Sequence, residues 1–195
     1  YFPKFYHPDP TVNRKSCFLA PSINSSNNRK NFLNLPYYLV LSDNKDATFS
    51  PRFYKHEEFL LQTEYRQVNE KSSHISDFSF KVDDDKNLKS HLFYFFNKRL
   101  SLNETSDSNV EIKVQKTSKE TYIKKNKIQS KLISDESILE NSLKFSFSKN
   151  DMSADFETII YEDLDKEDND RYEYILPKVN LVKKIDNKTS LDGNF

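Results

Sequence analysis

The stretch from Arg14 to Tyr54 decides the fold; it reads RKSCFLAPSI, then a polar Ser/Asn gap, then NFLNLPYYLVLSDNKDATFSPRFY. Its residue period predicts three β-strands in succession. A proline, Pro21 or Pro36, falls inside each of the first two, where a ladder hydrogen bond would otherwise form. The third strand alternates, with Ala47, Phe49, Pro51 and Phe53 on one face and Asp46, Thr48, Ser50 and Arg52 on the other.

Segments within and around this stretch carry a family resemblance: FYHPDPTV at 5–12, KSCFLAPS at 15–22, LPYY at 35–38, DNKDATFSPRFY at 43–54 and LLQTEYRQVN at 60–69. They resemble the LPS-assembly outer-membrane protein (LptD) family, in which a periplasmic β-jellyroll gives way to a membrane barrel. ETYIKK near Tyr122 and DRYEYILPKVNL at 170–181 look like later barrel strands of that family. Cys17 is a departure, because the family usually has glycine there, at the start of the first strand.

The composition of the 195 residues fits alternating strands. Charged residues make up 31% and mean hydropathy is −0.83, and no apolar run is long enough for a membrane helix. Aromatic residues nevertheless reach 14%, with 16 Phe and 11 Tyr. A polar average with heavy aromatic loading is typical of strands with one apolar face. Disorder is the alternative for such a polar chain, and the aromatic content argues against it.

Several function classes are disfavoured by the same composition. The single glycine, Gly193, cannot build a phosphate loop or a dinucleotide-binding turn. A net charge of zero argues against nucleic-acid binding. The lone Cys17 and four scattered histidines offer neither a disulfide nor metal-ligand spacing. We therefore expect no catalytic residue, no metal and no cofactor.

The expected fold is all-β: the N-terminal portion of an antiparallel outer-membrane β-barrel, preceded by the end of a periplasmic jellyroll. Residues 1–14 would be the end of the jellyroll and a linker, and residues 15–195 the first barrel strands of an internal fragment. Expected strands, spaced as in an up-and-down barrel, are 16–24, 31–42, 45–55, 58–69, 74–83, 90–102, 109–117, 121–131, 138–148, 152–162 and 171–184, with a last one from about Ser190.

The alternation also predicts which side chains would face lipid and which a wet lumen. The lipid-facing set comprises Phe49, Phe53, Phe59, Leu61, Phe78 and Phe80. The possible lumen-facing set comprises Arg52, Gln62, Glu64 and Arg66. Lysines of the middle segment, among them Lys131, are expected on a solvated polar face, with contacts to lipopolysaccharide phosphates as the alternative.

The resemblance implies outer-membrane transport and assembly of lipopolysaccharide in a Gram-negative bacterium, with no reaction catalysed. It implies a lateral seam near the first strands, with Pro21 and Pro36 as gate prolines. Implied partners are lipopolysaccharide, an LptE-like lipoprotein plug, periplasmic bridge proteins and outer-membrane lipids. The alternatives are a porin or receptor barrel of another family and a soluble glycan-binding β-sandwich.

Overall fold

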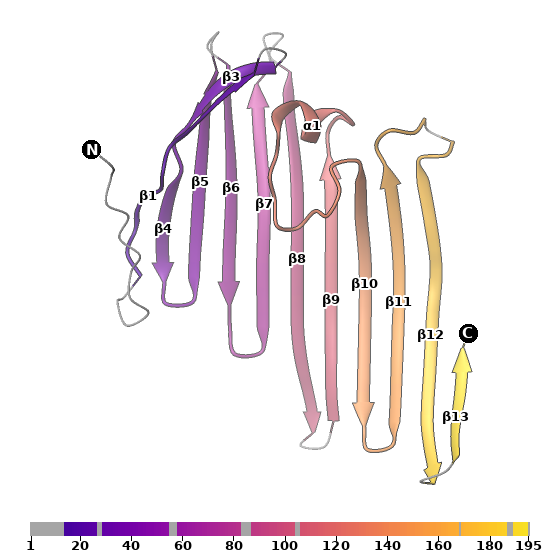
Figure 1. Cartoon of the computed structure of the whole chain (residues 1–195). Coiled ribbons are helices and arrows are strands. Elements are labelled where there is room, and N and C mark those ends of the chain that lie inside the picture. Colours follow the sequence, from indigo (N-terminus) through magenta and orange to yellow (C-terminus); the bar gives the residue numbers. More distant parts are fainter. Residues whose placement is uncertain are drawn as a thin grey trace.

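The structure is a computed structural model that describes residues 14–26, 29–54, 58–82, 87–103, 106–167, 169–186 and 189–194. Within these residues, thirteen β-strands form one antiparallel sheet (Figure 1). They are β1 Cys17–Phe18, β2 Ser22–Ser26, β3 Arg29–Asn34, β4 Tyr37–Ser42, β5 Lys45–Tyr54, β6 Phe59–Val68, β7 Ser72–Val82, β8 Leu88–Asn103, β9 Ser106–Thr117, β10 Ile138–Lys149, β11 Met152–Asp163, β12 Tyr172–Asp186 and β13 Thr189–Asn194.

The sheet is open within the described residues. Its order runs from β1 through β4 and then in sequence to β13, while the β2–β3 hairpin joins it through the pairing of β3 with β5. No pairing joins β1 to β13 in the described part of the chain. The all-β antiparallel expectation is confirmed, and closure into a barrel stays a prediction. Of the segment expected at residues 1–14 as the end of a jellyroll and a linker, residues 1–13 lie outside the described residues.

The connections differ between the two ends of the sheet. At the lower end in Figure 1, β4 and β5 are joined by a two-residue turn, as are β10 and β11. Asn150 opens the latter turn with a φ of 50°, a left-handed conformation that asparagine tolerates better than most residues. At the upper end, residues 118–137 join β9 to β10 and form the longest connection between described strands.

The structure places both prolines outside the strands. The strand expected at 16–24 is divided into β1 and β2, with Pro21 between them, and that expected at 31–42 is divided into β3 and β4 around Pro36. The expectation of a proline within each ladder is therefore wrong, because proline lacks the N–H that would continue the ladder. The Leu19 N–H donates instead to the Pro36 carbonyl at 2.8 Å.

The strand expected at 121–131 is also wrong. Those residues form the short helix α1, Tyr122–Asn126, followed by an irregular loop. Lys127 ends the helix in a left-handed conformation, with a φ of 48°. Figure 1 shows α1 and this loop in front of the central strands of the sheet.

The two faces of the sheet differ in chemistry. Directly opposed residues of neighbouring strands share a face, so Gln62, Ser79 and His91 lie together on what we call the polar face. The opposite, apolar face carries large exposed side chains: Phe53, Phe59, Phe78, Leu92, Val114 and Leu143. Within the described residues, no helix has the length and apolar character needed to cross a membrane.

Candidate functional site

The connection at residues 118–137, which we call the covering segment, packs on the polar face. Tyr122, Ile123 and Ile128 are buried, and they form the main hydrophobic cluster together with Leu60, Phe93, Leu139 and Leu164. Burying a large apolar side chain contributes about 1.5–3 kcal/mol. The segment is therefore held by a hydrophobic core of its own, in the middle of a face that is otherwise polar.

Arg52 on β5 anchors the covering segment through its main chain. Its Nη1 donates to the carbonyl oxygens of Asn126 at 2.5 Å and Lys127 at 3.2 Å, and its Nη2 donates to Gln62 Oε1 at 2.9 Å. Gln62 Nε2 in turn donates to the Gln129 carbonyl at 2.9 Å. These bonds satisfy carbonyls that the short helix leaves without a partner of its own.

A second network lies beneath Tyr122. Ser79 Oγ is 2.7 Å from Tyr122 Oη and 2.6 Å from His91 Nδ1, and His91 Nε2 is 3.3 Å from Asp77 Oδ1. Serine, histidine and aspartate are the residue types of a hydrolytic triad. Here the serine is buried and its oxygen is already bonded on two sides. Tyr122 bonds to this serine from the covering segment, so the network fastens the helix to the sheet.

Tyr122 stays neutral in this position. Burial is the main cause that raises its pKa, to about 12, and the hydrogen bond with Ser79 opposes that rise only in part. The hydroxyl therefore remains able to donate across the whole physiological range.

Ion pairs hold the covering segment at its outer side. Lys124 Nζ contacts both carboxylate oxygens of Asp165 at 2.6 Å, and Arg171 contacts Glu120 at 2.8 Å. The hydrogen bond from Lys124 lowers the pKa of Asp165, and the hydrogen bond from Arg171 lowers the pKa of Glu120. Asp165 and Arg171 both belong to the β11–β12 connection, so two neighbouring connections are tied together.

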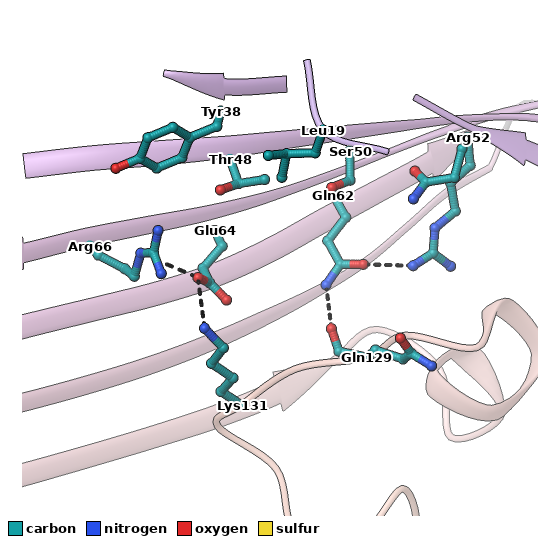
Figure 2. Close-up of a pocket in the computed structure, with 11 residues that line it drawn as sticks. Leu19, Tyr38, Thr48, Ser50, Arg52, Gln62, Glu64, Arg66, Gln129 and Lys131 are labelled. Atoms are coloured by element: carbon teal, nitrogen blue, oxygen red, sulfur yellow. Dashed lines mark hydrogen bonds and ion pairs between the residues drawn. The ribbon is translucent and has the colours of Figure 1, made fainter. Parts of the chain in front are cut away.

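The four residues expected at a lumen line one cavity of about 520 Å³. Figure 2 shows Arg52, Gln62, Glu64 and Arg66 on one side of it, with Gln129 and Lys131 of the covering segment on the other. Arg66 Nε is 2.7 Å from Asp46 Oδ1 and 3.4 Å from Glu64 Oε1. The structure thus brings the four together on the polar face, while their exposure to a barrel lumen stays a prediction.

Pro21 and Pro36 lie apart from that network, in the breaks between short strands at the N-terminal edge of the sheet. Leu19, two residues before Pro21, does line the cavity. Cys17 is exposed, in the two-residue β1. A gate role for the two prolines stays a prediction.

Sequence reasoning missed the Asp77–Ser79–His91–Tyr122 network. Ser79 and His91 are directly opposite in the β7–β8 hairpin, and Asp77 precedes Ser79 by two residues on the same face. A hairpin register would have revealed that juxtaposition. The adjacent apolar pair Tyr122-Ile123 also departs from strict alternation, a signal that this segment is no half-buried strand. No group of three or more His, Cys, Asp or Glu side chains that could hold a metal ion occurs among the described residues.

Comparison with known proteins identifies relatives of the chain. No family model matches it. LPS-assembly proteins LptD do match it. The LptD of Pseudoalteromonas translucida is 31% identical over 114 residues, which is 57% of this chain and 15% of the relative. The LptD of Mannheimia succiniciproducens is 32% identical over 49% of the chain and 14% of the relative. That of Pseudomonas aeruginosa is 34% identical over 43% of the chain and 10% of the relative.

The resemblance to the LptD family is confirmed. The match is partial, because it covers about half of this LptD-like chain and 10–15% of the three relatives. The chain thus resembles only a small part of the length of each of these LptD relatives.

Proposed function

We propose that this LptD-like chain forms part of an outer-membrane β-barrel that serves the transport and assembly of lipopolysaccharide in a Gram-negative bacterium. The observation that carries the proposal is the 31–34% identity to relatives named as LPS-assembly proteins. That name describes assembly and not a chemical reaction, and the buried Ser79 is in keeping with a protein that guides its substrate without transforming it.

The two faces of the sheet support the membrane part of the proposal. In lipid, the apolar face with Phe53, Phe78 and Leu92 needs no covering layer, and the polar face would line a wet interior. Antiparallel pairing satisfies the main-chain groups, as hydrocarbon requires. A soluble β-sandwich would need a second sheet over the apolar face. All thirteen strands of the described residues lie in one sheet.

The ends of the sheet support an orientation. Outer-membrane barrels have short periplasmic turns and longer extracellular loops. The two-residue turns at one end would then face the periplasm, and the covering segment would enter the barrel from the extracellular end (Figure 1). In this arrangement Arg52, Gln62, Glu64 and Arg66 face the lumen, where an LptE-like lipoprotein plug would also sit. Periplasmic bridge proteins would deliver the substrate from the other end.

The lateral seam is proposed at the N-terminal edge. β1 has only two residues, and β2 and β3 leave the line of β4 at the two proline breaks. An edge with so few ladder hydrogen bonds is the easiest part of the sheet to separate from a closing strand. The lipid part of lipopolysaccharide would leave through this seam while its sugars pass through the lumen.

The function is tested by conditional depletion of the protein that contains this chain, followed by measurement of surface lipopolysaccharide. Export should stop, so newly made lipopolysaccharide should fail to reach the outer leaflet, and plasmid-borne wild-type protein should restore its export. Unchanged surface lipopolysaccharide after complete depletion would contradict the proposal.

The seam is tested separately with Pro21→Ala plus Pro36→Ala in the same protein. The new N–H groups allow the interrupted strands to join, so the seam should tighten and export should slow. Pro177→Ala on β12 is the matched control, because it changes a strand proline far from β1 in the sheet order. Export at the wild-type rate by a normally folded double variant would leave both prolines as shape elements.

A further inference from the structure

We propose that the apolar face, at its lower end in Figure 1, binds the phosphate groups of glycerophospholipids in the inner leaflet of the outer membrane. The proposal rests on the proposed function, which puts this face in lipid and the two-residue turns in the periplasm. The observation that carries it is a set of four lysines at that end, which we call the lysine row: Lys45, Lys98, Lys149 and Lys183.

Two lysines of the row come from the N-terminal half of the sheet. Side chains an even number of positions apart along a strand share a face, as do directly opposed residues of neighbouring strands. Lys45 begins β5 and is eight positions from the exposed Phe53. Lys98 is six positions from the exposed Leu92 on β8 and lies opposite Ser72, the first residue of β7. Both lysines therefore lie on the apolar face, at its lower end.

The other two lysines come from the C-terminal half of the sheet. Lys149 ends β10, six positions from Leu143, and is directly opposite Met152, which begins β11. Lys183 on β12 is directly opposite the same Met152 from the other side. Lys149, Met152 and Lys183 thus line up across three neighbouring strands, again at the lower end of the apolar face.

The lysine row has no acidic neighbours on its own face. In the described parts of β5 to β12, no aspartate or glutamate takes a position at the lower end of the apolar face, and Asp43, Glu70 and Asp151 belong to the turns. None of the four lysines is ion-paired with a residue that the structure describes. Three of them are exposed, and Lys45 is partly exposed. The row therefore presents cations that complement phosphate.

Polar aromatic side chains gather at the same end of the face. Close to Lys98, His74 Nδ1 lies 2.9 Å from Tyr94 Oη, and Tyr65 Oη donates to Gln67 Oε1 at 2.8 Å. Tyrosine is enriched at membrane–water interfaces because its ring is apolar and its hydroxyl is polar. The hydrocarbon of the inner leaflet thus ends near these side chains, and the lysine row lies where the headgroups begin.

A glycerophospholipid matches both parts of this surface. A lysine next to apolar side chains lays its methylene stem along them and carries its ammonium group to the headgroups. There the ammonium donates a charge-assisted hydrogen bond to a phosphate oxygen, while the acyl chains cover the neighbouring Leu92 and Leu143. Inorganic phosphate would leave these leucines uncovered, and a soluble acidic protein would have to cover the apolar face as well as meet the lysines. The surface therefore fits phosphate that is joined to acyl chains.

The test is native mass spectrometry of the detergent-solubilised protein that contains this chain, titrated with phosphatidylglycerol. A triple variant, Lys98→Gln, Lys149→Gln and Lys183→Gln, should bind this lipid more weakly than the wild-type protein. Each lysine should contribute about fivefold to the affinity of the lipid that it contacts, as expected of one lysine near an anionic membrane surface.

The matched control is a second triple variant in the covering segment, Lys119→Gln, Lys125→Gln and Lys131→Gln. It changes the net charge by the same amount but leaves the apolar face untouched. All six lysines are exposed, so neither variant alters a buried contact, and circular dichroism checks that both fold. The control variant should keep the wild-type affinity for phosphatidylglycerol.

A parallel titration with zwitterionic phosphatidylcholine identifies the group that is recognised. An equal loss of affinity for both lipids in the lysine-row variant assigns the phosphate alone, and a loss confined to phosphatidylglycerol assigns the net charge of the lipid; both outcomes support the surface. Equal affinity of the two triple variants for phosphatidylglycerol, or no binding by the wild-type protein, overturns it.

This result is separate from the test of the proposed function, because lipid binding is measured without export. Failure of the proposed function would show as normal surface lipopolysaccharide after depletion. If depletion stops export and the two triple variants bind phosphatidylglycerol equally, only the lipid-binding surface is overturned.

Discussion

The N-terminal edge and the centre of the sheet are built from the same alternating pattern, yet they differ in order and burial. At the edge, Phe18 is 77% exposed and Ile23 79% exposed, and β1 pairs with β4 over two residues. In the centre, β5 to β10 have 10 to 16 residues each, and Leu60 and Phe93 are fully buried. The comparison separates what alternation alone provides from what long-range contacts add.

Two causes explain the difference. Proline breaks shorten the ladders at the edge, so each strand there has few neighbours to bond with. The covering segment lies over the centre and turns part of a polar sheet face into a core. The proposed seam requires a sheet edge that can separate from its neighbour and a centre that stays in place.

The largest expected effect comes from the centre. Leu60→Ala removes a fully buried side chain that packs with the covering segment, and it should lower the free energy of unfolding by about 2–5 kcal/mol. Leu41→Ala, at a half-exposed position of β4, should cost far less. Urea unfolding of the detergent-folded protein measures both, and equal costs would remove the distinction between centre and edge.

A charge on the apolar face should have the next largest effect. Phe78→Lys on β7 places an ammonium group where the proposal puts lipid, which near the midplane should cost about 2–4 kcal/mol. Ser76→Lys is no suitable control, because Ser76 lies on the same apolar face as Phe78. The matched control is Lys113→Phe on the polar face, where the cost in stability should be smaller. Folding yield into lipid vesicles is the measurement. Normal insertion of the Phe78→Lys variant would argue that this face is not in lipid.

The central strands could be predicted from the sequence alone because alternation is a local signal. Phe78 and Phe80 alternate with Asp77 and Ser79, and the structure places the two pairs on opposite faces. The helix at Tyr122 was missed because its stability comes from residues far away in sequence. Arg52 is 74 residues from the Asn126 carbonyl that it binds. Leu164, which belongs to the same hydrophobic cluster as Tyr122, lies beyond β10 and β11 in the sequence. No window of local sequence contains such contacts.

One wall of the cavity could be predicted from the sequence, because it depends only on local alternation. Gln62, Glu64 and Arg66 share a face by the period of one strand, so their proximity follows from the sequence. The other wall, Gln129 and Lys131, required the fold of the covering segment. The proline positions were recognised, but the strands were expected to run through them, because the period on either side of each proline continues without a change of phase.

A third, smaller effect tests the anchoring of the covering segment. Arg52→Met removes the bonds to the Asn126 and Lys127 carbonyls, and it should weaken docking by about 1.5–3 kcal/mol, the contribution of a hydrogen bond to a charged group. Trypsin should then cut faster after the lysines of the segment, which limited proteolysis with mass spectrometry detects. Arg99→Met on β8, outside the segment's contacts, is the control, and equal cutting rates would show that Arg52 does not hold the segment.

The smallest expected effect concerns pH and the outer ion pairs. The pKa of Asp165 is lowered in the folded protein by its hydrogen bond from Lys124. The pair is therefore fully formed above the unfolded pKa of an aspartate, about 3.9, and it is lost as pH falls through the lower folded value. The Glu120–Arg171 pair follows the same direction. Docking should thus be unchanged between pH 7 and 5 and should loosen only in stronger acid.

Hydrogen exchange at the Lys125 and Ile128 amides measures this loosening, because those amides donate within the covering segment to Thr121 and Ile123. After correction for the intrinsic pH dependence of exchange, their protection should fall in acid in the wild-type protein. In Asp165→Asn it should already be slightly lower at neutral pH and should change less in acid. A steep loss of protection between pH 7 and 5 would show that the outer ion pairs do not set the pH dependence of docking.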